Sequence, residues 1–181
     1  MKIGLDIDDV VAGYWESYCD YFNAYNNPKH LINANITKNV QRILKGDRNF
    51  WINLPVINRP NFTPELYCTK RVNNKSWTKE FITKNNLPNV PIYQMLYQHG
   101  NKATMIKGKV DIFVDDSISN MINMNLAGVP CLLMDTVNNQ DWGPVGRIYS
   151  LNKEEIEDAC ELFKVTMYPY FKDLCDEYRK V

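Results

Sequence analysis

Short apolar runs alternate with amphipathic segments along most of this chain. Runs of strand length, several of them rich in Ile, Val, Leu or Phe, predict buried strands at residues 2–6, 65–69, 90–96, 111–115, 130–134 and 147–150. Apolar positions spaced by three and four, with capping residues and glycine stops, predict helices at residues 76–86, 101–108 and 117–127 and from residue 152 onwards. Strands that alternate with helices predict an α/β fold with a doubly wound, Rossmann-like parallel sheet.

Residues 14–60 depart from this alternation. An aromatic-rich helix is expected over residues 13–26 and a second helix over residues 37–44, and a connection marked by Pro55 and Pro60 follows. We therefore expect one domain of 181 residues, with a core formed by residues 1–13 and 61–181 and a small helical insertion at residues 14–60 after the first strand.

Composition and charge narrow the classes of function. Lys plus Arg and Asp plus Glu both number 21, and this balance argues against a dedicated nucleic-acid binder while leaving small anionic substrates open. The five cysteines are odd in number and lack a C-x-x-C pair, which favours a reduced, cytoplasmic setting. Neither a signal peptide nor an apolar run of about 18 residues is visible, so no membrane association is expected.

Polar side chains that can carry chemistry follow four of the predicted strands. They are Asp6 and Asp8 after the first strand, Thr69 after the second, Lys102 after the third, and Asp115 with Asp116 after the fourth. The carboxyl ends of parallel strands meet at one edge of the sheet, so these groups are expected to converge. Singly, each has a plainer reading, as a turn cap, a solvated lysine or a helix cap. Together, crowded carboxylates call for a cation, and an all-oxygen ligand set favours Mg²⁺.

These segments resemble the four motifs of the haloacid dehalogenase superfamily of phosphohydrolases. Asp6-Ile7-Asp8-Asp9-Val10, Thr69, Lys102 and Asp115-Asp116 occur in the right order and on the expected elements. Lys107 is a rival to Lys102. The presence of the second acid, Asp8, is typical of the phosphatases of that superfamily rather than of its dehalogenases.

A finer similarity is to the 5'(3')-deoxyribonucleotidase branch. It rests on the motifs Asp-Ile-Asp-Asp-Val-Val-Ala, Phe50-Trp51-x-x-Leu54-Pro55, Thr69-Lys70-Arg71, Phe113-Val114-Asp115-Asp116 and Asn138-Asn139…Arg147. The chain departs from that branch at Lys70, where a small residue is more usual, and at Ser117, a position where arginine or serine varies. The resemblance implies a small-molecule phosphomonoester, presumed to be a nucleotide, as partner, and leaves a homodimer open.

The resemblance also implies roles for individual residues. Asp6 is the expected nucleophile and Asp8 the acid and base, while the Mg²⁺ ligands are Asp6, the backbone carbonyl of Asp8, Asp115 and Asp116, the last directly or through water. The expected phosphate-binding residues are Thr69, Lys70, Arg71 and Lys102. For Arg71, contact with a phosphate, contact with a carboxylate of the insertion and a plain surface position stay open.

The insertion is expected to act as a cap that covers the site and selects the substrate. Its candidates for stacking on a nucleobase are Trp15, Phe22, Phe50 and Trp51, although aromatic residues at helical spacing also form helix cores. The expected function is a Mg²⁺-dependent phosphomonoesterase of nucleotidase type. Three alternatives stay open: a phosphatase for another small phosphate such as a sugar phosphate, a non-catalytic phosphate-binding module, and a nucleic-acid 3'-phosphatase, which the balanced charge disfavours.

Overall fold

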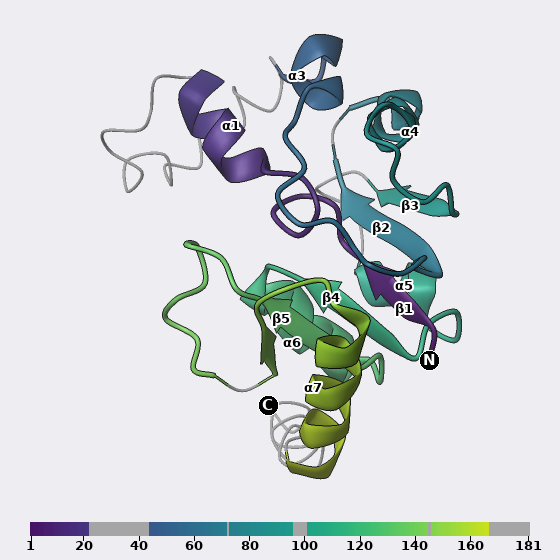
Figure 1. Ribbon diagram of the computed structural model, residues 1–181, viewed down its shortest axis with the longest axis vertical. Coiled ribbons are helices and arrows are strands. Elements are labelled where there is room, and N and C mark those ends of the chain that lie inside the picture. The colour runs from purple at the N-terminus through teal and green to yellow at the C-terminus, as the bar shows by residue number, and fades with distance from the viewer. Residues whose placement is uncertain (22–43, 72, 96–100, 145, 167–181) are drawn as a thin grey trace.

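The computed structural model describes residues 1–21, 44–71, 73–95, 101–144 and 146–166, and its centre is a parallel sheet (Figure 1). The six strands have the order β3-β2-β1-β4-β5-β6, and every neighbouring pair is parallel. Their bounds are β1 Ile3–Leu5, β2 Leu66–Lys70, β3 Ile92–Met95, β4 Ile112–Asp115, β5 Cys131–Met134 and β6 Arg147–Ile148. The order reverses between β1 and β4, which creates the switch point at which open α/β sheets bind ligands.

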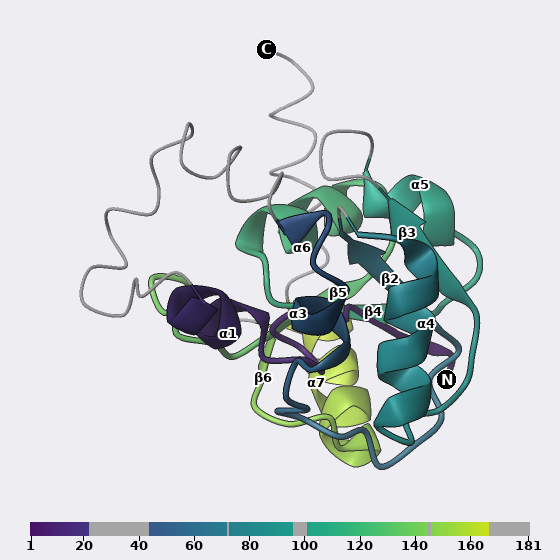
Figure 2. The ribbon, with the colours of Figure 1, turned by 90° about the horizontal axis from the view of Figure 1, so that it is seen from above.

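The helices cover both faces of this sheet. Their bounds are α1 Tyr14–Tyr21, α3 Arg48–Ile52, α4 Lys75–Lys84, α5 Lys102–Ile106, α6 Ile118–Leu126 and α7 Lys153–Thr166. Seen from above, α5 and α6 lie on one face of the sheet and α4 and α7 on the other (Figure 2). The predicted α/β, Rossmann-like fold is therefore confirmed, with the last strand shorter than the expected 147–150.

The core follows from the apolar centres of the strands. Every residue of β1, β4 and β5 is buried, as expected for strands covered on both faces. Gly4 in β1 has no space for a side chain, since a Cβ atom there would lie 2.8 Å from Phe113 and 2.9 Å from Val110. This close approach lets β1 sit at the centre of the sheet between β2 and β4.

Two helices differ in detail from their sequence-based expectations. The helix expected over residues 76–86 begins one residue earlier as α4, and its cap is Asn74, which accepts a hydrogen bond from the Ser76 amide at 2.9 Å. Phe50 and Trp51, which had no assigned element, lie in the short helix α3, whose cap Asp47 accepts from the Phe50 amide. The expected helix at residues 37–44 lies, apart from Leu44, outside the described residues.

The two ends of segment 14–60 are bonded to the loop that follows β1. The Gly13 amide donates to the Pro55 carbonyl at 2.9 Å, and the Ile57 amide donates to the Val11 carbonyl at the same distance. The Asn58 side chain donates to the Val10 carbonyl at 3.0 Å. These contacts form a narrow neck, residues 10–13 with 55–58, through which the segment leaves the core and returns to it.

Among the described residues, no helix combines the length and the apolar character that crossing a bilayer requires.

Candidate active site

The carboxyl ends of β1 and β4 bring two acidic residues side by side. The register pairs Leu5 with Val114, and the Asp6 amide donates to the Val114 carbonyl at 2.9 Å. Asp6, the residue after β1, and Asp115, the last residue of β4, therefore lie at the same level of the sheet edge, as the sequence predicted. Both residues are buried, at 5% and 0% exposure.

Lys102, the first residue of α5, joins these two carboxylates. Its Nζ atom lies 2.5 Å from Asp6 Oδ2 and 2.7 Å from Asp115 Oδ2. Burial opposes the charge of Lys102, yet the two carboxylates raise the pKa of its ammonium above the ordinary value. The rival Lys107 is exposed and donates instead to the Ala127 carbonyl at 2.8 Å. Of these two lysines, only Lys102 belongs to the acidic site.

Asp6, Asp115 and Asp116 form a group able to hold a metal ion. One carboxylate oxygen from each lies within 4.8 Å of the others. Burial raises the pKa of Asp6 to about 7. The attraction of Lys102 acts against this rise, and repulsion from Asp115 and Asp8 adds to it. Burial, with repulsion from Asp115 and Asp6, also raises the pKa of Asp116 well above its usual range. Negative charge is therefore in excess here, and a cation would relieve it.

Asp8 points to a different set of partners. The buried Arg71 guanidinium binds its carboxylate, with Nη2 2.5 Å from Oδ1 and Nε 2.9 Å from Oδ2. The Thr69 hydroxyl donates to Asp8 Oδ2 at 3.2 Å. Two residues predicted to bind phosphate thus contact the predicted acid and base in this structure.

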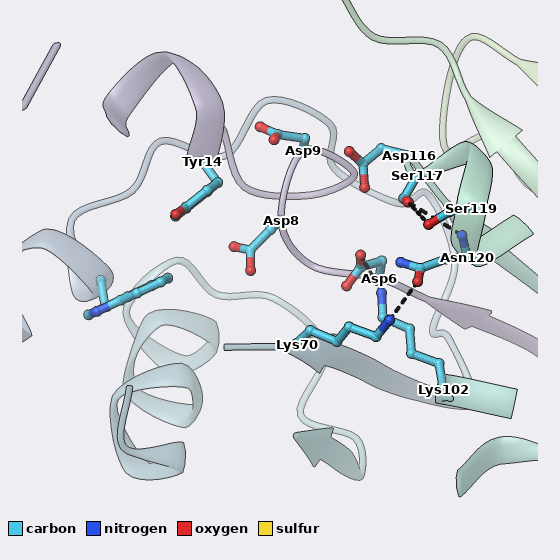
Figure 3. Close-up of a pocket in the computed structure, with 11 residues that line it drawn as sticks. Asp6, Asp8, Asp9, Tyr14, Lys70, Lys102, Asp116, Ser117, Ser119 and Asn120 are labelled. Carbon is cyan, nitrogen blue, oxygen red and sulfur yellow. Dashed lines mark hydrogen bonds and ion pairs between the residues drawn. The ribbon is translucent and has the colours of Figure 1, made fainter. Parts of the chain in front are cut away.

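A cavity of about 390 Å³ opens beside these groups. Figure 3 shows the carboxylates of Asp6 and Asp116 on one side, Tyr14 on the opposite side, and Asp8 between them. The remaining lining residues are Asp9, Trp51, Lys70, Lys102, Ser117, Ser119 and Asn120. Tyr14, Ser119 and Asn120 were not among the residues singled out from the sequence.

Lys70 and Asn120 form one wall of this cavity. Lys70 Nζ donates to Asn120 Oδ1 at 2.7 Å (Figure 3). Asn120 Nδ2 in turn donates to Asp115 Oδ1 at 3.0 Å. Burial and the nearby Lys102 ammonium lower the pKa of Lys70. Lys70 is thus a second cationic side chain at the cavity besides Lys102, as predicted, and the Asn120 side-chain amide holds it there. Asn120 lies in the first turn of α6. In the sequence, only its helical spacing from Asp116 could have identified it as a residue of this site.

The four predicted stacking residues have different positions. Trp51 lines the cavity, and its indole Nε1 donates to the Leu44 carbonyl at 2.8 Å. Tyr14 stacks on Trp51 with ring centroids 5.7 Å apart and planes at 14°. Phe50 packs edge-on against Trp51 at 5.2 Å inside this aromatic cluster and does not line the cavity. Trp15 stacks on Tyr18 and faces elsewhere, while Phe22 lies outside the described residues.

Asp9 separates this cavity from a second one of about 250 Å³. Its backbone is left-handed, with φ of 56°, and its Oδ1 accepts from the Trp15 amide at 2.8 Å. Burial raises the pKa of Asp9 to about 7. Trp15, Asn58 and Asp135 are among the residues that line the second cavity.

The loop after β5 is bound to the acidic site. Asn139 Nδ2 donates to the Asp116 carbonyl at 2.8 Å. The Arg147 guanidinium donates to Asn139 Oδ1 at 2.6 Å and to the Asn139 carbonyl at 2.8 Å. Arg147 also forms an ion pair with Asp135 at 2.5 Å. The Asn138-Asn139…Arg147 motif thus supports the backbone that carries Asp116.

In comparisons with known proteins, no family model matched this chain, and no curated protein showed significant similarity to it.

Proposed function

We propose that the protein is a Mg²⁺-dependent phosphomonoesterase of the haloacid dehalogenase type that acts on nucleoside monophosphates. The observation that carries this proposal is Lys102 between Asp6 and Asp115, at the edge of a cavity that Asp8 also lines. A nucleophile, a proton donor and positive charge for the phosphoryl group are what hydrolysis of a phosphate monoester requires.

The donor set fits Mg²⁺. The cluster of Asp6, Asp115 and Asp116 offers only carboxylate oxygens, and hard oxygen ligands suit Mg²⁺ better than a transition metal. Burial and then repulsion between the carboxylates raise the pKa of Asp6 and Asp116, and a divalent cation would neutralise that repulsion. Once bound, the ion would screen the charge between Asp6 and the phosphoryl oxygens.

The side chains would act in two steps. A carboxylate oxygen of Asp6 attacks phosphorus, the bond to the leaving oxygen breaks, and Asp8 supplies the proton to that oxygen. Water then attacks the phosphorus of the aspartyl-phosphate, Asp8 takes up its proton, and the bond to Asp6 breaks to release phosphate. Lys102 and Lys70, which line the cavity, would bind phosphoryl oxygens.

A nucleoside is the leaving group that we favour, because the far wall of the cavity is aromatic. Tyr14 and Trp51 both line it and are stacked on each other. A base stacked on such a wall gains on the order of 1–3 kcal/mol, judged from single-stranded nucleic acids. A sugar phosphate would leave this wall unused.

The test is phosphate release from a panel of nucleoside monophosphates and sugar phosphates, with and without Mg²⁺. We expect Mg²⁺-dependent release, with nucleotides having the higher kcat/KM. Equal kcat/KM for sugar phosphates would favour the broader phosphatase, and release from no ester would favour a non-catalytic phosphate-binding module.

A further inference from the structure

Arg71 is a buried cation whose charge is directed at Asp8. Its side chain is 0% exposed and that of Asp8 is 18% exposed. Nε also lies 3.0 Å from Asp8 Oδ1, so both carboxylate oxygens are bound. Within the described ranges, Asp8 is the only carboxylate that Arg71 contacts. Because the planar guanidinium binds through two of its nitrogen atoms, this contact fixes the orientation of the Asp8 carboxyl group.

The guanidinium is also held on its other sides. Its central carbon lies 5.2 Å from the ring centroid of Trp51 and 5.6 Å from that of Phe81. Nη1 lies 3.4 Å from the Thr78 hydroxyl, which itself donates to Gln94 at 2.7 Å. Asp8 lines the 390 Å³ cavity and Arg71 does not. Any effect of Arg71 on a molecule in the cavity would therefore be exerted through its contact with Asp8.

We propose that Arg71 is a positioning residue that holds the carboxyl group of Asp8 at the cavity, in the orientation that lets it exchange a proton with the reacting water. This inference rests on the proposed function. In the second step, water forms the new bond to phosphorus, the bond from phosphorus to Asp6 breaks, and the water proton moves to Asp8. Asp8 has given up its proton in the first step, and because Arg71 and Thr69 keep it in place, hydrolysis of the aspartyl-phosphate should not be the slow step.

The experiment compares the two steps with nitrophenyl phosphate. Nitrophenolate is a good leaving group that needs little protonation, so its release reports the first step. We expect the wild-type protein to show no burst of nitrophenolate. In Arg71→Met, Asp8 loses the contact that orients it as the base of the second step, and we expect a burst approaching one nitrophenolate per active site. Steady-state kcat should then be lower by roughly ten-fold to a hundred-fold, with KM changed by less than about three-fold.

Two further variants make the test specific. Arg48→Met removes an exposed arginine that pairs with Glu80 between α3 and α4, and it should behave as wild type. Arg71→Lys keeps the charge but loses the two-pronged geometry, and we expect a smaller burst and an intermediate kcat. This variant also provides the measurement if Arg71→Met does not fold.

The outcomes separate the two hypotheses. If the wild type is active but Arg71→Met and Arg71→Lys lose rate without a burst, the positioning role is overturned and the proposed function stands. A higher KM, with weaker inhibition by inorganic phosphate and an unchanged kcat, would instead make Arg71 a phosphate ligand. A wild-type protein that hydrolyses no phosphate ester would overturn the proposed function and this inference with it.

Discussion

Lys102 Nζ lies 2.5 Å from Asp6 Oδ2, and both groups are buried. Removing the ammonium would leave the acidic cluster without its nearest positive charge. We expect Lys102→Met to lower kcat/KM by roughly a hundred-fold or more. The free energy of unfolding should fall by about 3 kcal/mol, as when one partner of a buried ion pair is lost. Steady-state kinetics and urea denaturation measure the two effects.

Lys107→Met is the matched control for this variant. Lys107 is exposed, and its ammonium donates to the Ala127 carbonyl rather than to the acidic cluster. We expect activity within about two-fold of wild type and stability within about 0.5 kcal/mol. Equal losses in the two variants would contradict the assignment of Lys102 to the site.

Asp6→Asn should abolish turnover and leave the fold intact. The amide cannot act as the nucleophile and is a poor ligand for Mg²⁺, so kcat should fall by roughly a thousand-fold or more. Replacing a carboxyl whose pKa burial raises to about 7 also removes repulsion, so the metal-free variant should not be less stable than wild type at pH 8. Asp141→Asn, at an exposed position, is the control. Substantial turnover by folded Asp6→Asn would exclude the covalent mechanism.

Stability of the metal-free protein should decrease as the pH rises from about 4 to 7. The pKa of Asp6 is raised from 3.8 to about 7 by burial, so between these values the folded state holds more protons than the unfolded state. Stability therefore falls with rising pH in this window. Asp9, whose pKa burial also raises to about 7, adds to the same trend.

Mg²⁺ should remove the part of this pH dependence that comes from the acidic cluster, because a cation at Asp6, Asp115 and Asp116 favours their ionised forms. The contribution of Asp9 should remain. We expect Mg²⁺ to raise the Tm by on the order of 5 °C at pH 8 and by much less at pH 5. Thermal denaturation with chelator or with added Mg²⁺ measures both. Activity should be lost with chelator and restored by Mg²⁺ but not by zinc. Full activity without any divalent ion would refute the metal site.

Tyr14→Leu should weaken binding of nucleotides more than it slows chemistry. Tyr14 lines the cavity and stacks on Trp51, so we expect KM for a nucleoside monophosphate to rise roughly ten-fold, with kcat changed little. Trp51→Ala should also raise this KM, and it should lower kcat as well because its ring lies over Arg71. KM for nitrophenyl phosphate should change less in Tyr14→Leu, since its ring need not reach this wall.

Trp15→Leu is the control for the aromatic wall. Trp15 stacks on Tyr18 and lines the second cavity, so its loss should leave KM for both substrates nearly unchanged. If Tyr14→Leu raises KM equally for both substrates, the aromatic cluster serves the packing of the insertion and the preference for nucleotides loses its support.

The sequence predicted the positions of Asp6, Lys102 and Asp115 because strand ends are easily recognised. Asp6 and Asp115 end short apolar runs, and Lys102 follows the helix cap Asn101. The parallel register of β1 and β4 then brings the two aspartates together. The same logic did not distinguish Tyr14 from Trp15. Neighbouring residues on a helix point about 100° apart, and only the packing of α1 against α3 decides which one faces the cavity.

The partner of Arg71 could not be predicted for a similar reason. Its position just after β2 allowed contact with a phosphate, a carboxylate or solvent, and the choice depends on where Trp51 and Phe81 leave space for the guanidinium. Asn139 and Arg147 were found as part of a motif, but their action on the Asp116 carbonyl depends on a loop path with no periodic signal.

The neck that joins segment 14–60 to the core has a consequence for how such a protein can diversify. Its two ends are bonded to each other at Gly13 and Pro55, so another segment could be spliced between them without altering the register of the sheet. Chemistry at the strand ends and choice of leaving group could then evolve separately. Trp51 is the exception, since its ring lies over Arg71. A transplanted segment would have to bring its own flat group to that position, or the carboxylate of Asp8 would lose its orientation.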